Sequence, residues 1–469
     1  MFILTTWAKP DWPSDTGIMA EAGIVMDMDS GAILYGQNIH LTYPPASITK
    51  ILTALIVLEN CNLDDTVTFS TTAVNQVEAD SGNKISVVAG DQLSVEDCLY
   101  SMLLVSCNQA ANALAEHTAG SISAFVNMMN EKLAQLGCQE SHFENPSGLN
   151  GDNQYVSAYD MALIAQAAYD NETLVEISSA TTHKIAPTTQ NPDGFTIRGE
   201  HRLCVTEDPS SPYYYPEAVA GKTGYLIKAG NTLVTYAVKD NRRLISVILK
   251  GQPRQYFVDG KALLEFGFRS FQDYTVADYE SRYVTGNETI NLDKGSFQAS
   301  DLMIDPDSVI TLPNSASFED ADITLGALPE ISPDNAVALL TYSYNDRTIG
   351  TAYLLAKDGV TIDGNDSAAE AATTAFDTAN AEAPLATASN AEKPQRPHKH
   401  ISVAGVLITI LIVLLVLGVI GLISWFIYSK KKEAKALAKR RERRRQRLQR
   451  SGDEEEFERL LAEYKNKKK

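Results

Sequence analysis

An uncharged apolar segment near the C-terminal end constrains this 469-residue chain more than any other feature. Residues 403–428 carry no charged side chain and consist mainly of Val, Leu and Ile. A helix of 26 such residues is long enough to cross a bilayer, and the segment lacks the polar face of a helix in a soluble core. The sequence therefore predicts one transmembrane helix over 403–428.

The charges on either side predict how that helix is oriented. Residues 429–469 contain 17 Lys/Arg and 8 Asp/Glu, whereas residues 1–428 contain 23 basic and 51 acidic side chains. Because basic flanks remain in the cytoplasm, residues 429–469 are expected to be a basic cytoplasmic tail and the rest of the chain to be extracellular. We therefore expect a single-pass protein of the cell membrane. The acidic main part argues against a nucleic-acid partner, which would require a basic face.

An extracellular domain must be exported, and the start of the chain offers no clear signal peptide. The apolar stretch Met1–Leu4 is followed too soon by Lys9 and Asp11 to be the hydrophobic part of one. We expect either that a signal was trimmed or that the true start lies upstream.

The part before the membrane segment divides into three regions. Residues 20–275 begin with two predicted strands, continue with several helices and end with a predicted hairpin and a last helix, a pattern typical of an α+β domain whose sheet joins both ends of the chain. Residues 276–360 have short β-prone stretches between Asp, Pro and Asn turns, which indicates a small all-β domain. Residues 361–402 are rich in small and polar residues and are expected to be a disordered stalk.

Cysteine and histidine usage predicts neither a disulfide framework nor a metal site. The five cysteines are odd in number and have no C-x-x-C spacing, so buried free thiols are expected. Among the seven histidines only His398 and His400 are closely spaced, and they adjoin the membrane segment. No metal and no cofactor are expected.

The first candidate motif is Ser47-Ile48-Thr49-Lys50 at a predicted helix start. Positions i and i+3 share a helix face, so the Lys50 amine can reach the Ser47 hydroxyl. A serine becomes a useful nucleophile when a neighbouring base accepts its proton, and burial or nearby cations can lower the pKa of a lysine enough for that role. Taken alone the motif is weak, because about one or two such matches arise by chance in a chain of this length.

Two further motifs follow in order. Ser106-Cys107-Asn108 lies at an interruption of the helical pattern of residues 94–120, and alone it indicates only a helix break. Lys222-Thr223-Gly224 precedes the predicted hairpin and is therefore expected to begin a strand of the sheet. Taken alone, this motif would also fit the start of a strand that carries a surface lysine.

Order and context of the three motifs carry a family resemblance. S-x-x-K at a helix start, S-x-N about sixty residues later and K-T-G on a strand resemble the penicillin-recognising acyl-serine enzymes. Residues 143–149 (FENPSGL), 157–162 (SAYDMA) and Gly267-Phe268 resemble the serine-type D-alanyl-D-alanine carboxypeptidases among them. The resemblance covers about residues 20–275. It implies a β-lactamase/transpeptidase-like fold, and the β domain after it matches the family's usual second domain.

The resemblance also implies a role for each motif residue. Ser47 would attack the carbonyl between the two D-alanines of a peptidoglycan stem peptide, with Lys50 accepting the serine proton. Ser106 would relay a proton to the leaving D-alanine, and Asn108 would hold the substrate amide and Lys50. β-Lactams would be covalent inhibitors of the same site.

The K-T-G segment would bind the carboxylate end of the substrate. Lys222 would supply positive charge and Thr223 a hydrogen bond, while Gly224 would leave room for the substrate along the strand edge. The backbone N–H groups of Ser47 and Tyr225 would form the oxyanion hole.

Two alternatives remain open on the sequence. One is a transpeptidase or β-lactamase on the same scaffold, although no clear E-x-x-x-N element supports a β-lactamase of the common class. The other is a non-catalytic receptor that is acylated by β-lactams and signals across the membrane, which the predicted span and the charged tail motivate. The leading interpretation is a membrane-anchored serine D-Ala-D-Ala carboxypeptidase.

Overall fold

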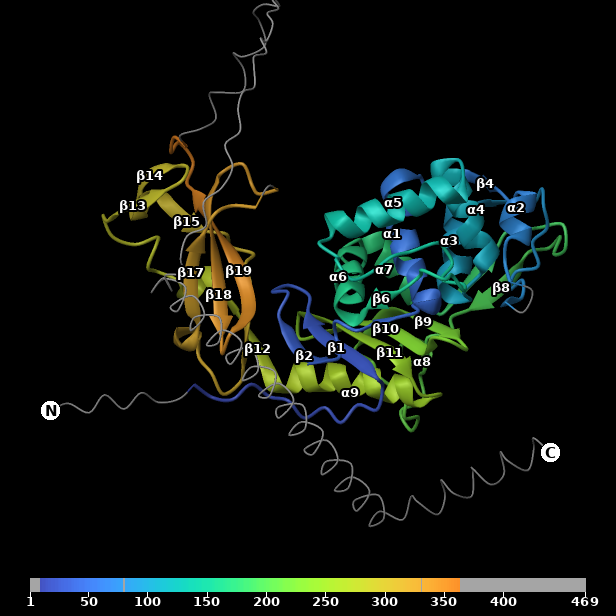
Figure 1. Cartoon of the computed structure of the whole chain (residues 1–469), viewed down its shortest axis with the longest axis horizontal. Coiled ribbons are helices and arrows are strands. Elements are labelled where there is room, and N and C mark those ends of the chain that lie inside the picture. The colour runs from blue at the N-terminus through green and yellow to red at the C-terminus, as the bar shows by residue number, and fades with distance from the viewer. Residues whose placement is uncertain (1–8, 79–80, 330, 363–469) are drawn as a thin grey trace, which may run out of the picture. The chain divides into compact units, whose positions relative to one another are not determined.

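The computed structural model describes residues 9–78, 81–329 and 331–362 (Figure 1). Within these ranges no helix combines the length and the apolar character needed to cross a membrane. The predicted span 403–428, the cytoplasmic tail 429–469 and nearly all of the predicted stalk 361–402 lie outside the described residues.

A five-stranded antiparallel sheet organises the first part of the chain, in the order β2-β1-β11-β10-β9. The prediction that this sheet joins both ends of the domain is confirmed, because β1 pairs with β11 with Ala22 opposite Leu249. Asp240 and Asn241 form the tight β10–β11 turn, both with positive φ (50° and 66°), as a type I′ hairpin requires. The strands are β1 Ala22–Asp27, β2 Ile33–Gln37, β9 Ala218–Leu226, β10 Gly230–Lys239 and β11 Arg242–Gly251.

Helices cover both faces of this sheet (Figure 1). Because successive strand residues point to opposite faces, Ile24 packs into the core shared with the larger group of helices, whereas Val25 packs on the α9 side. The prediction of a helical region broken near Ser106 is confirmed, because α3 ends at Leu104 and α4 begins at Asn108. The main helices are α1 Lys50–Asn60, α3 Val95–Leu104, α4 Asn108–Ala119, α5 Ile122–Gln135, α6 Ala158–Tyr169, α7 Glu172–Ser179 and α9 Gln255–Ser270.

Helix starts follow local sequence chemistry. Ser94, Ser121 and Ser157 each precede a helix and accept a hydrogen bond from the backbone N–H three residues later, which satisfies a donor that the helix leaves unpaired. Shorter elements complete this part: η1 Ala46–Thr49, α2 Thr71–Asn75, α8 Arg202–Val205, and the paired strands β3 Thr42–Tyr43 with β6 Val156–Ser157, β4 Thr66–Thr68 with β5 Gln92–Ser94, and β7 Thr182–Ile185 with β8 Phe195–Arg198.

A second hydrophobic core follows and is built mainly from strands, as the sequence predicts for this region. Leu340, Tyr342 and Leu354 are fully buried in it, and its main sheet has the order β15-β19-β18-β17. The elements are β12 Phe271–Thr275, α10 Val276–Tyr279, β13 Thr289–Leu292, β14 Gly295–Gln298, η3 Ala299–Asp301, β15 Leu302–Ile304, β16 Val309–Pro313, η4 Phe318–Asp320, β17 Asp322–Gly326, β18 Ala336–Tyr344 and β19 Arg347–Ala356.

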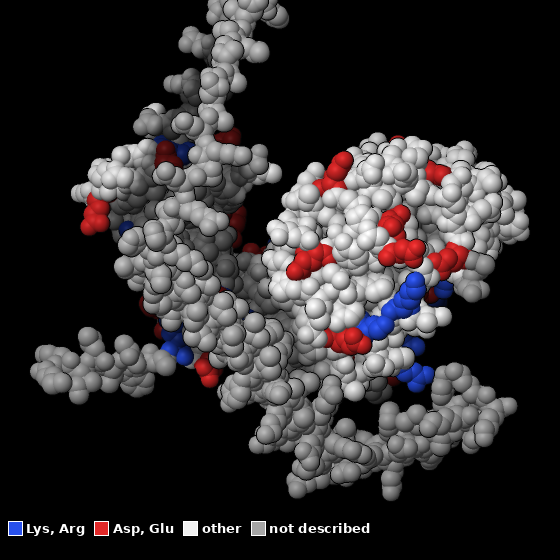
Figure 2. All heavy atoms as spheres, viewed as in Figure 1, with Lys and Arg blue, Asp and Glu red and all other residues white. Residues whose placement is uncertain are grey.

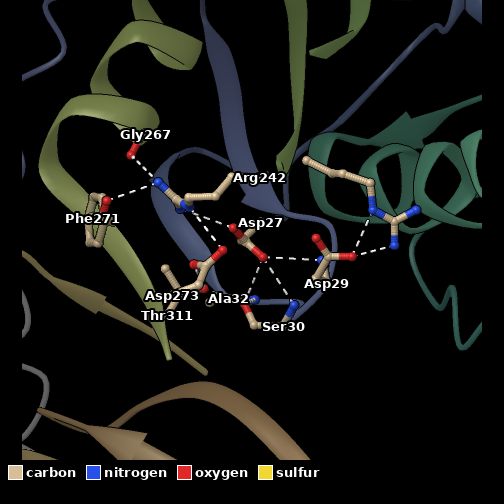
Figure 3. Close-up of polar contacts among 10 residues, drawn as sticks. Asp27, Asp29, Ser30, Ala32, Arg242, Gly267, Phe271, Asp273 and Thr311 are labelled. Carbon is tan, nitrogen blue, oxygen red and sulfur yellow. Dashed lines mark hydrogen bonds and ion pairs between the residues drawn. The ribbon is translucent and has the colours of Figure 1, made fainter. Parts of the chain in front are cut away.

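Arg242 joins the five-stranded sheet to the β12–β16 pair (Figure 3). Its guanidinium donates to Asp27 at 3.1 Å and to Asp273 at 2.9 Å, and Asp273 accepts a further bond from the Thr311 hydroxyl at 2.8 Å. The Thr311 and Ser30 hydroxyls lie 2.7 Å apart. Burial, together with the charge of Asp273, raises the pKa of Asp27 to about 6, although Arg242 opposes the rise.

Candidate active site

Ser47 and Lys50 lie one turn apart at the point where η1 runs into α1. The Lys50 Nζ atom is 3.1 Å from the Ser47 Oγ atom and 2.8 Å from Asn108 Oδ1, and it also contacts the backbone carbonyl of Ser147. Lys50 is fully buried. The structure thus brings the predicted nucleophile, the predicted base and the predicted Asn108 together.

The surroundings of Lys50 favour its neutral amine. Burial lowers the pKa of Lys50 well below its usual value, and the nearby positive charge of Lys222 lowers it further. An amine that is partly unprotonated near neutral pH can accept a proton from an adjacent hydroxyl. The Ser47–Lys50 pair therefore has the geometry and the electrostatics of a nucleophile beside its base.

Ser106 occupies the short segment between α3 and α4. Its φ of 61° lies in the left-handed region, which is uncommon for a residue other than glycine and is concentrated at functional sites. Its Oγ atom is buried and has no hydrogen-bond partner among the described residues. Asn108, two residues on, is the first residue of α4 and is directed at Lys50. A buried hydroxyl without a partner is available to a group that enters the site.

Lys222 lies on β9, which is the edge strand of the sheet. Its side chain is 1% exposed, and its ammonium donates to the Thr223 carbonyl at 2.9 Å. Burial lowers the pKa of Lys222 to about 8, with Glu200 opposing the change and Lys84 adding to it. At pH 7 Lys222 is therefore mainly cationic, which suits the binding of a carboxylate.

The prediction that K-T-G begins its strand is wrong. β9 starts at Ala218, and the motif lies in its second half. The reason is the pairing with β10, which already engages Ala218 opposite Ala237 and Gly221 opposite Thr235. The small residues before the motif pair with β10, although small side chains have a low β-propensity and the sequence therefore does not indicate a strand there.

Gly224 marks the closest approach of β9 to the nucleophile. A Cβ atom at this position would lie 2.8 Å from the Ser47 backbone nitrogen and 2.3 Å from Thr232 Oγ1. The Thr232 hydroxyl donates to the Pro45 carbonyl at 2.9 Å, so strand β10 also holds the segment that leads to Ser47. Only glycine allows this approach, which places the amide of Ser47 beside the edge of β9. Tyr225 follows with its side chain 63% exposed.

Several residues that support the site were not predicted as site residues from the sequence. The carbonyl of Ser147 accepts from Lys50, and Gly148, with φ of +80°, packs so closely on the Ala46 carbonyl that a Cβ atom would lie 1.9 Å from it. Asn145 folds this loop by accepting from the Gly148 N–H at 2.8 Å. The sequence feature that could have indicated these contacts is the F-E-N-P-S-G-L stretch. It contributed to the family resemblance, but no role in the site was assigned to it.

His201 is a further residue beneath the K-T-G strand that sequence reasoning passed over. Its Nε2 atom is 3.1 Å from the Val234 carbonyl, and a Cβ atom on Gly221 would lie 2.6 Å from the same nitrogen. Burial lowers its pKa to about 4, so the ring is neutral at physiological pH. A single histidine without a spaced partner gave no signal in the sequence.

The described part of the chain contains all five cysteines and many of the side chains that could bind a metal ion. All five cysteines are free. Cys98, Cys107 and Cys138 are buried, as predicted, whereas Cys61 and Cys204 are only partly buried, so the prediction of burial is wrong for these two. Burial raises the pKa of the Cys107 thiol, between Ser106 and Asn108, to about 11, so it remains protonated. No group of three or more His, Cys, Asp or Glu side chains that could hold a metal ion occurs in residues 9–78, 81–329 and 331–362.

Comparison with known proteins identifies the family. A family model described as D-alanyl-D-alanine carboxypeptidase, a peptidase family, matches residues 9–252. The D-alanyl-D-alanine carboxypeptidase DacB2 of Mycobacterium tuberculosis is 34% identical over 265 residues, which cover 55% of this chain and 84% of that protein. DacA of Haemophilus influenzae is 31% identical over 354 residues, covering 72% of this chain and 84% of the relative.

A solved structure is also similar. The crystal structure of D-alanyl-D-alanine carboxypeptidase from Mycobacterium tuberculosis has 31% sequence identity and a TM-score of 0.48, and the match covers 56% of this chain and 94% of that one. The sequence matches make this chain a peptidase, and therefore a hydrolase. It belongs to the D-alanyl-D-alanine carboxypeptidase family.

Proposed function

We propose that the chain is a membrane-anchored serine D-Ala-D-Ala carboxypeptidase that removes the terminal D-alanine of peptidoglycan pentapeptides through an acyl-enzyme on Ser47. The observation that carries the mechanism is the position of the Lys50 amine, 3.1 Å from the Ser47 hydroxyl and buried beside the cation of Lys222. This arrangement supplies a nucleophile, a base and a binding charge without any cofactor.

Acylation begins when the Ser47 Oγ atom attacks the carbonyl of the penultimate D-alanine and its proton passes to Lys50. A new C–O bond forms, and the oxyanion faces the backbone N–H groups of Ser47 and Tyr225. The close approach at Gly224 supports this placement, because it sets the Ser47 amide against β9. Collapse of the intermediate breaks the C–N bond, and the proton that Lys50 took from Ser47 passes through the Ser106 hydroxyl to the departing amine, which leaves Lys50 neutral and Ser106 protonated as before.

The substrate ends in a carboxylate, which an acidic protein would otherwise repel. Lys222 offers it a positive charge and Thr223 a hydroxyl, and both lie on an edge strand that can pair with an extended peptide. Asn108 holds Lys50 and is available to the substrate amide. Water then hydrolyses the acyl-enzyme, which releases the shortened peptide and restores Ser47.

Membrane anchoring is part of the proposal and rests on the sequence of residues 403–428 and the basic residues after them. The full chain is expected in the membrane fraction with its catalytic part outside, and a chain that ends at residue 402 is expected in the soluble fraction. Equal distribution of both chains between the fractions would contradict this part.

The decisive experiment measures D-alanine release from a peptide ending in Lys-D-Ala-D-Ala by the full chain in detergent, with Ser47→Ala as the matched control. Release by the parent alone, together with a penicilloyl adduct on Ser47 found by peptide mass spectrometry, is the expected result. A parent that binds a fluorescent penicillin but releases no D-alanine would refute hydrolysis of the peptide. Adduct formation on Ser47→Ala would refute the assigned nucleophile.

A further inference from the structure

Two segments that none of the three motifs includes are anchored on either side of the loop that carries Ser106. One is the turn of residues 82–87, where the Gly82 carbonyl accepts from the buried Gln109 side chain at 3.2 Å, at the start of α4. The other contains Glu200, whose backbone N–H donates to the carbonyl of Leu104, the last residue of α3, at 3.2 Å. The two segments therefore flank the Ser106 loop.

An ion pair joins the two segments. The Lys84 ammonium lies 3.4 Å from the Glu200 carboxylate, and each side chain is 46% exposed. The turn that carries Lys84 is held in shape by Asn83, whose side chain bonds both backbone groups of the buried Val87, at 2.7 and 3.2 Å. The pair thus forms a Lys84–Glu200 bridge from one side of the Ser106 loop to the other.

The same bridge lies near the K-T-G segment. His201, the neighbour of Glu200, packs against Gly221, where a Cβ atom would lie 2.6 Å from the histidine Nε2 atom. Gly221 in turn precedes Lys222 on β9. The charges agree with this placement, because Glu200 raises the pKa of Lys222 and Lys84 lowers it. The bridge therefore lies beside both the S-x-N and the K-T-G segments.

Pairing of these charges matters because the proposed substrate ends in a carboxylate. The chain has a formal net charge of −19, and Figure 2 shows carboxylates scattered over the face in view. An unpaired Glu200 near Lys222 would add a negative charge where the substrate carboxylate has to bind. Lys84 offsets this charge, so the bridge can border the site without repelling the substrate.

In the proposed mechanism, the residue that is released occupies this end of the site. Ser106 passes a proton to its amine, and Lys222 and Thr223 bind its carboxylate. Amine, carboxylate and side chain are attached to one carbon atom. The side chain of the released residue is therefore held at the end of the site that the bridge borders.

We propose that the Lys84–Glu200 bridge restricts the released residue to one with a small side chain, such as the methyl group of D-alanine. A longer side chain has to displace the ion pair. This inference rests on the proposed function, because that function places the released residue beside the bridge. It adds two specificity-determining residues that lie outside the three motifs.

The test uses three peptides of the form acetyl-Lys-D-Ala-X that differ only in the released residue X. X is D-alanine, D-2-aminobutyrate or D-norleucine, in order of increasing side-chain length. All three form the same acyl-enzyme on Ser47, so differences in kcat/KM arise before X leaves. For the full chain in detergent, kcat/KM is expected to fall about fivefold from D-alanine to D-norleucine, the upper end of what an exposed ion pair contributes.

Variants assign this preference to the bridge. Lys84→Ala and Glu200→Ala are each expected to raise kcat/KM for D-norleucine relative to D-alanine about fivefold, and the double variant no further, because either change removes the same pair. Exchange of the charges, Lys84→Glu with Glu200→Lys, should restore the parental ratio. Lys132→Ala is the matched control, because it breaks another partly exposed ion pair, 2.7 Å from Glu59 at the far end of α1, and should leave the ratio unchanged.

The outcomes separate this inference from the function on which it rests. Equal kcat/KM for the three peptides, or a preference that survives both single variants, would overturn the bridge as a determinant while leaving the carboxypeptidase intact. A charge-exchanged variant as permissive as the single variants would overturn the ion pair as the cause. No D-alanine release by a parent that still reacts with a fluorescent penicillin would refute the proposed function itself.

Discussion

Replacing Gly224 by alanine tests whether the close approach of β9 to the nucleophile is what the site requires. The added Cβ atom would lie 2.3 Å from Thr232 Oγ1, 2.8 Å from the Ser47 nitrogen and 3.1 Å from Ala46 Cβ. Ordinary van der Waals contact begins at about 3.4 Å, so at least one of these groups must move by about 1 Å. Thr232 cannot yield freely, because its hydroxyl holds the Pro45 carbonyl.

The expected loss is larger in reaction rate than in stability. Adding one methyl group to a well-packed site costs about 1–3 kcal/mol, which a domain of this size can absorb. A displacement of about 1 Å between nucleophile and substrate lowers rates by roughly 100-fold, and loss of an oxyanion donor has a similar effect. Gly224→Ala is therefore expected to fold and to be acylated about 100-fold more slowly.

The assay follows the rate of covalent labelling by a fluorescent penicillin, together with a thermal melt of the same sample. Gly326→Ala is the matched control, because it also lies in a strand, β17, and its Cβ atom would meet only the Leu339 carbonyl at an ordinary 3.7 Å. The control should label at the parental rate and melt within a few degrees of the parent. Parental labelling by a folded Gly224→Ala would refute the argument that this contact positions Ser47.

Three further predictions concern charge and backbone geometry. Burial lowers the pKa of Lys222 to about 8, so carboxylate binding is present below pH 8 and lost above it; kcat/KM should fall about tenfold per pH unit on the alkaline side, and a profile flat to pH 10 would contradict this. The pKa of Asp27 is raised to about 6 from 3.8, so the folded state holds a proton that the unfolded state releases, and the free energy of unfolding falls by about 3 kcal/mol as pH rises from 4 to above 6. Asp27→Asn should remove this pH dependence in urea titrations. Parallel pH curves for the parent and the variant would exclude Asp27 as its source. Gly148→Ala would place an alanine at a positive φ with its Cβ atom 1.9 Å from the Ala46 carbonyl oxygen, so the melting temperature measured by calorimetry should fall by about 5 °C or more. An unchanged melting temperature would refute the argument that this position requires glycine.

The elements that sequence reasoning predicted well are those with strong local signals. The β10–β11 hairpin follows from two apolar stretches on either side of Asp240 and Asn241, and both turn residues adopt the positive φ that such a pair tolerates. The break between α3 and α4 was visible because Ser106-Cys107-Asn108 interrupts an otherwise helical pattern. In both cases a few adjacent residues determine the local backbone.

What the sequence could not supply is contact between distant segments. Ser147 meets Lys50 across 97 positions, and Thr232 meets Pro45 across 187. Neither spacing has a periodicity that marks it, because tertiary packing alone brings these segments together. The early start of β9 was missed for a related reason, since small residues such as Ala220 and Gly221 become strand only through pairing with β10. The predicted membrane span stays a prediction, as does the tail.

The hydrogen bonds around Lys50 bear directly on which form of its amine the site accommodates. The Nζ atom has three polar neighbours: the Asn108 side-chain oxygen, the Ser147 carbonyl and the Ser47 hydroxyl. The first two can only accept, whereas a hydroxyl can also donate. A neutral amine has two N–H groups and one lone pair, so it satisfies both acceptors and leaves the lone pair for the Ser47 O–H. An ammonium could only donate to these three oxygens, so it could not accept the Ser47 proton. It would also place a buried positive charge near the cation of Lys222, which is unfavourable. The two lysines thereby divide the work we propose for them: Lys222 keeps its proton for the substrate carboxylate, and its charge helps Lys50 to stay free to take the proton of Ser47.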